Sequence, residues 1–537
     1  MGQGASVRRR SWLVGVAGAA AGSLVGCGPP PAAPPIAQWV GASPLRGHRL
    51  RDATAAQAPT ADAVPRQAGV LVIGAGVAGL AAARALARRG IHDVQLLELE
   101  DAPGGNSRAH AIDGQRCPLG AHYLPLPGRD AIDVAELLHE LGLLRSELGR
   151  TVADERHLCH SPQERLFIDG GWHDGLLPPA ADGSATLAQY RRFEAATTRA
   201  QRELGFAMPT HRARWSSAHE QLDRRRFVDW LDAEGLTDVR LRWYLDYACR
   251  DDYGAGLHTV SAWAGLHYFA SRHGFHAPGS DGGERDAVFT WPEGNAWLVE
   301  RLARPFVDGR LQLGRTVWRV DVQRRSVTAW CWDEARARAE RWTARAVVLA
   351  APLFVAARLL TAPPPGLIEA ATLQRHAPWL VANVALKSPL LDRVPGAPPA
   401  WDNVRFDSPS LGYVDAAHQS LRAAPDRALI TAYWALPAGE RGSLLAESSA
   451  DMWSRRVVDD LAVAHPDLPA KVARIDLMRY GHAMSIPRPG VRSHPALAAL
   501  ARLNGPLVFA HADLAGYSVF EEAFTHGTRA GASLRLL

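Results

Sequence analysis

The sequence predicts an α/β protein, α+β overall, in which a Rossmann-like domain is interleaved with a mixed helical and β domain. Three observations lead to this prediction. Residues 69–90 read as a strand, a glycine-rich turn and a helix, and residues 505–535 read as a strand, a loop and a helix. Between them lie amphipathic helical patterns and short apolar runs typical of a sheet. We therefore expect a domain that opens near residue 69 to be completed at the far end of the chain.

The glycine-rich turn is specific because of what flanks it. The first glycine allows a tight turn, the second lets the backbone approach a pyrophosphate, and the third lets the helix pack closely on its strand. The N-terminus of that helix offers free N–H groups to the anion. The turn comprises Gly74, Gly76, Val77, Ala78 and Gly79. We predict that it binds a dinucleotide.

An acidic residue ends the next predicted strand. The segment DVQLLELE places Glu98 22 residues after Gly76, where a carboxylate can accept hydrogen bonds from the ribose of adenosine. A tight turn in an ordinary α/β domain would explain the glycines alone, but not the matched strand, helix and acid.

Later segments are expected to close over the same cofactor. Two loops follow Glu98, and their candidate contacts are Gly105, Arg108, Gly120, Ala121 and His122. A predicted meander and return strand over residues 315–352 lead back to the core. The C-terminal segment supplies a loop with Asp513 and a helix that begins near Phe520.

Together these pieces resemble the flavin-containing amine oxidase superfamily, which includes phytoene desaturase-like and protoporphyrinogen oxidase-like enzymes. The resemblance covers residues 69–125, about 292–355, and 505–535. It implies FAD as the cofactor, with Asp513 at its ribityl or pyrophosphate group, and a turn at 292–294 nearby. A dehydrogenase using NAD needs no such distal strand and helix, so we expect FAD rather than NAD.

The expected organisation has seven parts. They are a signal at 1–27, a Pro/Ala-rich tether at 28–67, FAD-binding pieces at 68–130, 292–360 and 481–537, a helical part of the substrate domain at 131–291, and its sheet part at 361–480.

The first residues predict export. Arg9 and Arg10 precede an apolar stretch that ends in Leu-Val-Gly-Cys, which resembles a twin-arginine leader with a lipobox at Cys27. Twin-arginine export carries folded proteins, which suits a protein that takes up its cofactor in the cytoplasm. Gly28 favours the outer membrane, so we expect a periplasmic protein anchored by lipid at Cys27.

Composition excludes one class of partner. The formal charge of +5 comes almost wholly from scattered arginines, because Lys387 and Lys471 are the only lysines. Without a dense basic run we expect no nucleic-acid binding. Cysteines 117, 159, 249 and 331 could pair outside the cytoplasm, but they are irregularly spaced, so no specific disulfide is predicted. The run from His157 to His160 reads as a loop rather than a metal site.

The resemblance also indicates what is missing. Amine oxidases of the superfamily commonly place a lysine near flavin N5, and the matching position holds Val381, with Lys387 more peripheral. Rapid reaction of the reduced flavin with oxygen is therefore in doubt. At the position of an aromatic cage residue stands Ala483, beside His482. His482 is our first catalytic candidate, and a hydrogen-bonded structural histidine is the alternative.

The second catalytic candidate is Tyr517, which resembles the other cage aromatic; a core tyrosine is its alternative. Asp251 and Asp252 suit a cationic substrate, but we expect them to pair with an arginine such as Arg250. Trp263, His267 and Tyr268 recur at helical spacing and are expected mainly in the core. Glu521 and Glu522 are expected in the first turn of the last helix.

The sequence thus predicts an exported FAD-dependent oxidoreductase that oxidises a small organic substrate, an amine by resemblance, through hydride transfer to flavin N5. The electron acceptor is not indicated. A desaturase- or isomerase-like enzyme for an apolar molecule would have pocket walls without acids. A non-catalytic envelope flavoprotein would have a sealed flavin with no cavity beside it.

Overall fold

The computed structural model describes residues 1, 36–52, 62–272, 274–280, 287–392, 394–416, 418–419, 427–446 and 449–536. Residues 37–537 form one compact unit. The predicted export signal and Cys27 lie outside the described residues. Among the described helices, none is long and apolar enough to cross a membrane.

A five-stranded parallel sheet lies at the heart of the unit. Its order is β13 (Leu311–Gln312), β4 (Val94–Leu97), β3 (Val70–Ile73), β17 (Ala346–Leu349) and β23 (Leu507–Phe509), and each neighbouring pair is parallel. The side chains of β3 and β17 are buried throughout, as expected for parallel strands covered on both faces. Strands from three distant parts of the chain meet here, which confirms the interleaved Rossmann-like fold.

Two helices from opposite ends of the sequence cross on this sheet. The helix α3 (Val77–Arg88) follows the glycine turn, and α17 (Phe520–Ser533) is the last helix of the chain. A Cβ on Gly527 of α17 would lie 2.1 Å from the carbonyl oxygen of Ala78. The two backbones are therefore in direct contact, and only glycine fits at this crossing.

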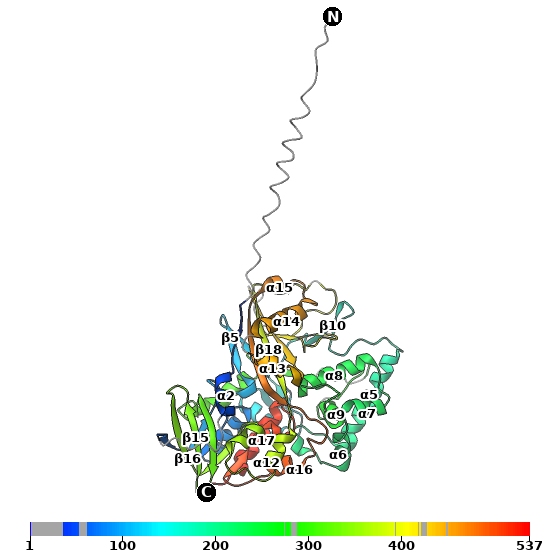
Figure 1. Ribbon diagram of the computed structural model, residues 1–537. Helices are drawn as coiled ribbons and strands as arrows, with labels where there is room; N and C mark the ends of the chain where they lie inside the picture. Colours follow the sequence, from blue (N-terminus) through cyan, green and yellow to red (C-terminus); the bar gives the residue numbers. More distant parts are fainter. Residues whose placement is uncertain are drawn as a thin grey trace. The chain divides into compact units, whose positions relative to one another are not determined.

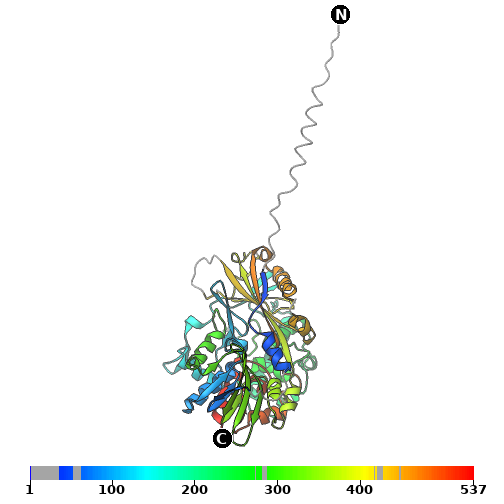
Figure 2. The ribbon, with the colours of Figure 1, turned by 60° about the vertical axis from the view of Figure 1, so that its left-hand side comes forward.

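An antiparallel meander forms a second layer. It comprises β14 (Arg315–Val322), β15 (Val327–Asp333) and β16 (Arg338–Ala344), with β2 (Val64–Gln67) added parallel to β16. Figures 1 and 2 both show these green strands at one end of the unit, away from α14 (Ala450–Ala462) and α15 (Leu468–Lys471). The predicted meander is confirmed.

Part of the predicted tether is folded. Within residues 28–67 the structure has β1 (Ile36–Trp39), α2 (Pro44–Asp52) and β2. These short elements are held by tertiary contacts, since the Ser43 amide donates to Glu100 at 3.2 Å and Arg46 pairs with Asp101 at 2.6 Å. Such contacts leave no apolar periodicity in the sequence, which is why we did not predict them.

An eight-stranded mixed sheet forms the third layer. Its order is β1, β22 (Val472–Ser485), β18 (His376–Leu386), β21 (Ala428–Ala435), β20 (Tyr413–Asp415), β19 (Asp402–Arg405), β10 (Glu164–Ile168) and β11 (Gly171–Asp174). The predicted strands β18 and β21 are confirmed. The strands β10 and β11 come from a region that we expected to be helical, and they join the sheet through parallel pairing of β10 with β19.

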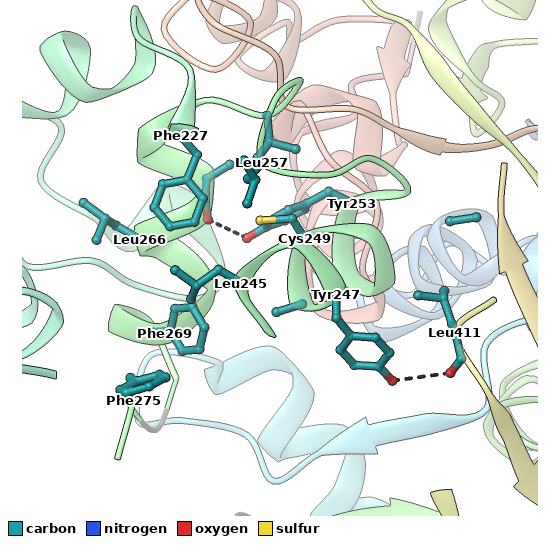
Figure 3. Close-up of a cluster of buried hydrophobic side chains, with 14 of the residues drawn as sticks. Phe227, Leu245, Tyr247, Cys249, Tyr253, Leu257, Leu266, Phe269, Phe275 and Leu411 are labelled. Atoms are coloured by element: carbon teal, nitrogen blue, oxygen red, sulfur yellow. Dashed lines mark hydrogen bonds between the residues drawn. The ribbon is translucent and has the colours of Figure 1, made fainter. Parts of the chain in front are cut away.

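Five helices gather beside this sheet, to the right in Figure 1: α5 (Ala185–Leu204), α6 (Ser217–Asp223), α7 (Phe227–Ala233), α8 (Val239–Tyr253) and α9 (Ala262–Ala270). Leu245, Cys249 and Tyr253 recur every fourth residue along α8 and are buried. Figure 3 shows this face packed against Phe227 and Phe269, with the Tyr253 hydroxyl donating to the Ala264 carbonyl at 2.9 Å. This packing fixes the rotation of α8.

The remaining elements connect these layers. They are β5 (Ala109–Ile112), β6 (Gln115–Pro118), β7 (Tyr123–Pro125), α4 (Ile132–Glu140), β8 (Leu144–Glu147), β9 (Arg150–Ala153), β12 (Val288–Thr290), α10 (Ala296–Ala303), α11 (Leu353–Leu359), α12 (Leu367–Leu373), α13 (Arg441–Leu445) and α16 (Pro495–Ala501).

Candidate active site

A cavity of about 440 Å³ begins at the glycine turn and runs between the parallel sheet and the eight-stranded sheet. Most of the predicted cofactor residues line it: Gly74, Gly76, Val77, Ala78, Glu98, Gly105, Gly120, Ala121, His122 and Phe520. The beginning and the end of the chain therefore meet around one space. Gly79, Arg108 and Asp513 are not part of its lining.

Gly79 lies one layer behind the cavity wall. A Cβ at this position would lie 1.9 Å from the carbonyl oxygen of Gly74 and 3.2 Å from Cβ of Ala350. The helix α3 can approach β3 and β17 only because this residue lacks a side chain. The close approach brings the first amides of α3 to the cavity, where an anion would bind.

Glu98 both faces the cavity and holds the turn. Its carboxylate accepts hydrogen bonds from the amides of Ala75, at 2.7 Å, and Glu100, at 3.0 Å. Burial raises the pKa of the Glu98 carboxyl. A carboxylate fixed in this way is placed to accept further hydrogen bonds from a ligand in the cavity.

The side chains of Arg108 and Asp513 form hydrogen bonds with other groups of the protein. Arg108 is buried, and its guanidinium donates to the Gly105 carbonyl at 3.1 Å. Asp513 is fully buried and accepts from the Leu353 amide at 2.9 Å and from Nε2 of His376 at 3.1 Å. Burial opposes ionisation of Asp513, but His511 and His376 outweigh it and hold its pKa well below the usual range. The structure does not bring these two side chains into the cavity.

His482 lines the cavity near its exposed mouth. Its ring lies 4.9 Å from that of Phe354 and 6.1 Å from that of His376, between ring centroids. The protein atoms around the ring, with Arg441 and His376, lower the pKa of His482 to about 4, so the ring is neutral at neutral pH. Its catalytic role stays a prediction.

Tyr517 lies in the core. Its hydroxyl donates to Oε1 of Glu522 at 2.9 Å and lies 3.1 Å from Nε2 of His267, and the residue lines neither cavity described here. Glu522 also accepts from the Thr210 amide at 2.6 Å. This placement matches the core alternative and gives no support to a catalytic role for Tyr517.

The aromatic wall comes from residues that we did not predict. Trp379, Tyr433 and Tyr480 line the cavity from adjacent strands, around the buried Val381, and Tyr123 lines it from β7. The hydroxyl of Tyr433 donates to the Gly120 carbonyl at 3.1 Å, which ties the sheet to the loop that lines the cavity. Lys387 is exposed beyond the end of β18, and the described lining contains no lysine.

A second cavity of about 500 Å³ adjoins the first. His122, Tyr123, Asp251, Arg272 and Tyr433 line both. The ring of His122 stacks on that of Tyr433 with 4.4 Å between centroids, and burial lowers the pKa of His122 to about 3. We call this second space the acidic chamber because of the carboxylates in its wall.

The acidic chamber holds Glu164, Asp251 and Asp402. Parallel pairing of β10 with β19 sets Glu164 beside Asp402. Burial, followed by the neighbouring charges of Glu164 and Asp251, raises the pKa of Asp402 well above its usual range. Burial and the charge of Asp252 raise the pKa of Asp251 to about 7. Buried carboxyls whose charged form is disfavoured in this way are stabilised by a cation between them.

The arginine expected beside these acids is a different one. Arg250 pairs with Asp246 at 3.0 Å, and Asp252 pairs with Arg272 at 3.1 Å. The hydroxyl of Tyr123 approaches Asp251 at 3.4 Å. The expected ion pair with an arginine is therefore present at Asp252, with Arg272 rather than the neighbouring Arg250 as the partner, and Asp251 and Asp252 both line the first cavity.

Most of the other predicted positions are structural; the exceptions are Tyr268, in the acidic chamber, and Glu521, in the lining of the first cavity. Nδ1 of His157 accepts a hydrogen bond from the Trp291 indole at 2.9 Å. The described residues contain no group of three or more potential ligands that could hold a metal, and the four described cysteines are free. Trp263 and His267 are core residues, whereas Tyr268 lines the acidic chamber. Glu521 and Glu522 lie in the first turn of α17, as predicted.

A comparison with protein-family models matches residues 77–534 to the family described as flavin containing amine oxidoreductase. This protein belongs to that family. A search of curated protein sequences found no match.

Solved structures show the fold of this flavin containing amine oxidoreductase in other proteins. Putrescine oxidase with bound putrescine is 19% identical, with a TM-score of 0.66, and the match covers 87% of this chain and 99% of that one. Cyclohexylamine oxidase from Brevibacterium oxydans IH-35A is 18% identical, with a TM-score of 0.62, over 87% and 98%. A fatty acid isomerase from P. acnes is 16% identical, with a TM-score of 0.59, over 86% and 97%.

The cofactor of this flavin containing amine oxidoreductase is FAD, and the first cavity fits it. The cavity combines a helix N-terminus, a loop without side chains and a fixed carboxylate, as a dinucleotide needs. Two buried polar atoms of residues in its lining, Nε1 of Trp379 and Oδ1 of Asn295, have no partner within the described part of the chain. These unpaired groups indicate a polar ligand.

Proposed function

We propose that this protein oxidises a small organic substrate, an amine in the first instance, by hydride transfer to N5 of FAD. The observation that carries the proposal is the acidic chamber beside the cofactor cavity. A protonated amine between Asp251 and Asp402 would stabilise their charged forms, which burial first and neighbouring acids second disfavour. The aromatic rings of Tyr247, Tyr268 and Trp401 would exclude water from its carbon chain and attract its charge.

The chain's own residues have distinct parts in this proposal. Bound FAD supplies the hydride acceptor. The carboxyl of Asp251, with a pKa of about 7, is divided between both protonation states near neutral pH. It can therefore attract the ammonium group and accept the proton that an amine must lose before oxidation. His122, whose pKa is about 3, stays neutral, and the positive charge of Arg272 in the lining is paired with Asp252 at 3.1 Å.

The two cavities and their carboxylates also separate this proposal from an enzyme for an apolar molecule and from a non-catalytic flavoprotein. A desaturase- or isomerase-like enzyme for an apolar molecule would have walls without carboxylates, and the acidic chamber has three. A non-catalytic flavoprotein would have a sealed cofactor, whereas the first cavity adjoins a second one through shared residues. Both observations favour turnover of a cationic substrate.

Anaerobic bleaching of the yellow holoprotein tests the proposal. We expect monoamines or diamines to bleach the flavin absorbance, and polyenes and uncharged isosteres of the same amines to leave it unchanged. Bleaching by polyenes alone, or by no member of the panel, would contradict the proposal. Readmission of oxygen then separates an oxidase from a dehydrogenase, and Val381 in place of a lysine predicts slow reoxidation.

We also infer, from residues 1–28 alone, export by the twin-arginine route and a lipid anchor at Cys27 on the periplasmic side of the outer membrane. We expect Cys27→Ser to move the protein from the membrane fraction to the soluble periplasm, because the acylated thiol is lost. Cys159→Ser is the control, since Cys159 lies in the folded unit. A wild-type protein that is already soluble would rule out the anchor.

A further inference from the structure

Three arginines lie close to one another behind the wall of the first cavity, where the exposed His482 marks its mouth, and the charge of Arg441 acts on His482. Arg441 donates to the carbonyl oxygens of His376, at 2.6 Å, and Gly481, at 2.8 Å, and His376 and His482 both line the cavity. Arg488 donates to the Leu373 carbonyl at 2.7 Å. We call Arg375, Arg441 and Arg488, together with the neutral His482 beside them, the basic rim; its charge comes from the arginines.

No carboxylate balances the basic rim within the described part of the chain. The ion pairs of the described residues include none with Arg375, Arg441 or Arg488, and Nε of Arg488 is buried without a partner. Burial and then the charge of Arg375 lower the pKa of both Arg441 and Arg488. By contrast, the buried Arg315 pairs with Asp333 at 3.0 Å. An unbalanced cationic cluster gains from binding an anion.

The rim and the acidic chamber are separate. None of the residues that line the chamber belongs to the rim, and the two carry opposite charges. Arg375 and His482 are exposed, so an ion from solvent reaches the rim directly. A cavity whose two approaches have opposite sign directs a cation to one and an anion to the other, because each approach raises the local concentration of its counter-ion.

We propose that the basic rim binds an anionic electron acceptor. The proposal rests on FAD in the adjoining cavity, and does not depend on which substrate reduces it. With ferricyanide as the probe, two electrons leave the reduced flavin and reduce two ferricyanide ions to ferrocyanide, and two protons pass to solvent. The rim's part is electrostatic, since it holds the anion at the cavity mouth during the transfer.

Arg375→Glu tests the rim without disturbing the fold, because the exposed Arg375 side chain makes no hydrogen bond or ion pair within the described residues. The holoprotein is photoreduced without substrate and mixed with acceptor at low ionic strength. We expect the variant to react with ferricyanide at least about tenfold more slowly than wild type, and with hexaammineruthenium(III) faster. Ferrocyanide binding to the oxidised holoprotein, measured by calorimetry, should weaken by a similar factor. Added salt should reduce both differences.

Arg341→Glu on β16 is the matched control, since it makes the same change of charge at an exposed position outside both cavities. Equal effects of the two variants would mean that only net charge matters, and would overturn the proposal. So would unchanged ferricyanide kinetics in Arg375→Glu. Slower reduction of the flavin by a carboxylate-bearing substrate, with ferricyanide kinetics unchanged, would make the rim a substrate site instead. Because photoreduction needs no substrate, these outcomes are independent of the proposed amine oxidation.

Discussion

Replacing Gly79 with alanine is expected to give a protein that is purified without its yellow colour. The new methyl group would lie 1.9 Å from the carbonyl oxygen of Gly74 and 3.2 Å from Cβ of Ala350. The first contact is with backbone, so the side chain cannot escape by rotation. The helix α3 must move away from the sheet, and its N-terminal amides then leave the place where the pyrophosphate of FAD would bind.

We expect Gly79→Ala to weaken FAD binding more than it lowers folding stability. Overpacking of this kind lowers stability by about 1–3 kcal/mol, which a large domain survives, while displacement of the amides removes several hydrogen bonds to one anion. We expect FAD affinity to fall by at least about a hundredfold, measured by flavin fluorescence during reconstitution. Gly128→Ala is the control, because a Cβ there meets nothing within 4 Å and should leave the protein yellow. A yellow Gly79→Ala protein with wild-type affinity would contradict the close-approach argument.

The cofactor cavity was predictable because its signals are local. Three glycines at fixed spacing, with a strand before and a helix after, specify one structure with little help from the rest of the chain. The helices α8 and α9 were predictable for a similar reason, since their buried residues recur at helical spacing.

The acidic chamber was not predictable, because it depends on pairing over long distances. Glu164 lies beside Asp402 only through the parallel register of β10 with β19. Neither residue stands in a motif, and β10 itself lies in a region that reads as helical. The choice of Arg272 rather than Arg250 as the partner of Asp252 has the same origin, since the packing of α8 decides which side chains reach the cavities.

Tyr517 and Asp513 show a different limit. The resemblance to the amine oxidase superfamily placed both near the cofactor, and the chain around them does line the first cavity through Ala512, Ser518 and Phe520. The direction of each side chain is set by the short 3₁₀ segment Ala512–Ala515 and by buried partners from remote elements. A resemblance can therefore locate a segment at a site without showing which side chains face the ligand.

Asp251→Asn is expected to lower kcat/KM for an amine substrate by about a hundredfold, which is the loss of one charge-assisted hydrogen bond of about 2–3 kcal/mol. The prediction rests on the proposed function. Asp251 lines both cavities, and its pKa is about 7. Below that pH the wild-type carboxyl is protonated and no longer attracts a cation, so kcat/KM should rise as the pH passes upward through 7. An aliphatic amine, with a pKa of about 10, stays charged throughout this range.

The asparagine variant should lack this rise, and Asp251→Glu should restore part of both rate and pH dependence. The melting temperature of Asp251→Asn should be equal to or above that of wild type, because the substitution removes a carboxyl whose charged form is disfavoured by burial and by Asp252. This combination separates a role in binding from a folding defect, which would lower activity and melting temperature together. Asp308→Asn, at an exposed ion pair with Arg310, is the control and should change neither. If kcat/KM depended on pH in the same way in Asp251→Asn and wild type, the charge that attracts the substrate would belong to another residue of the chamber.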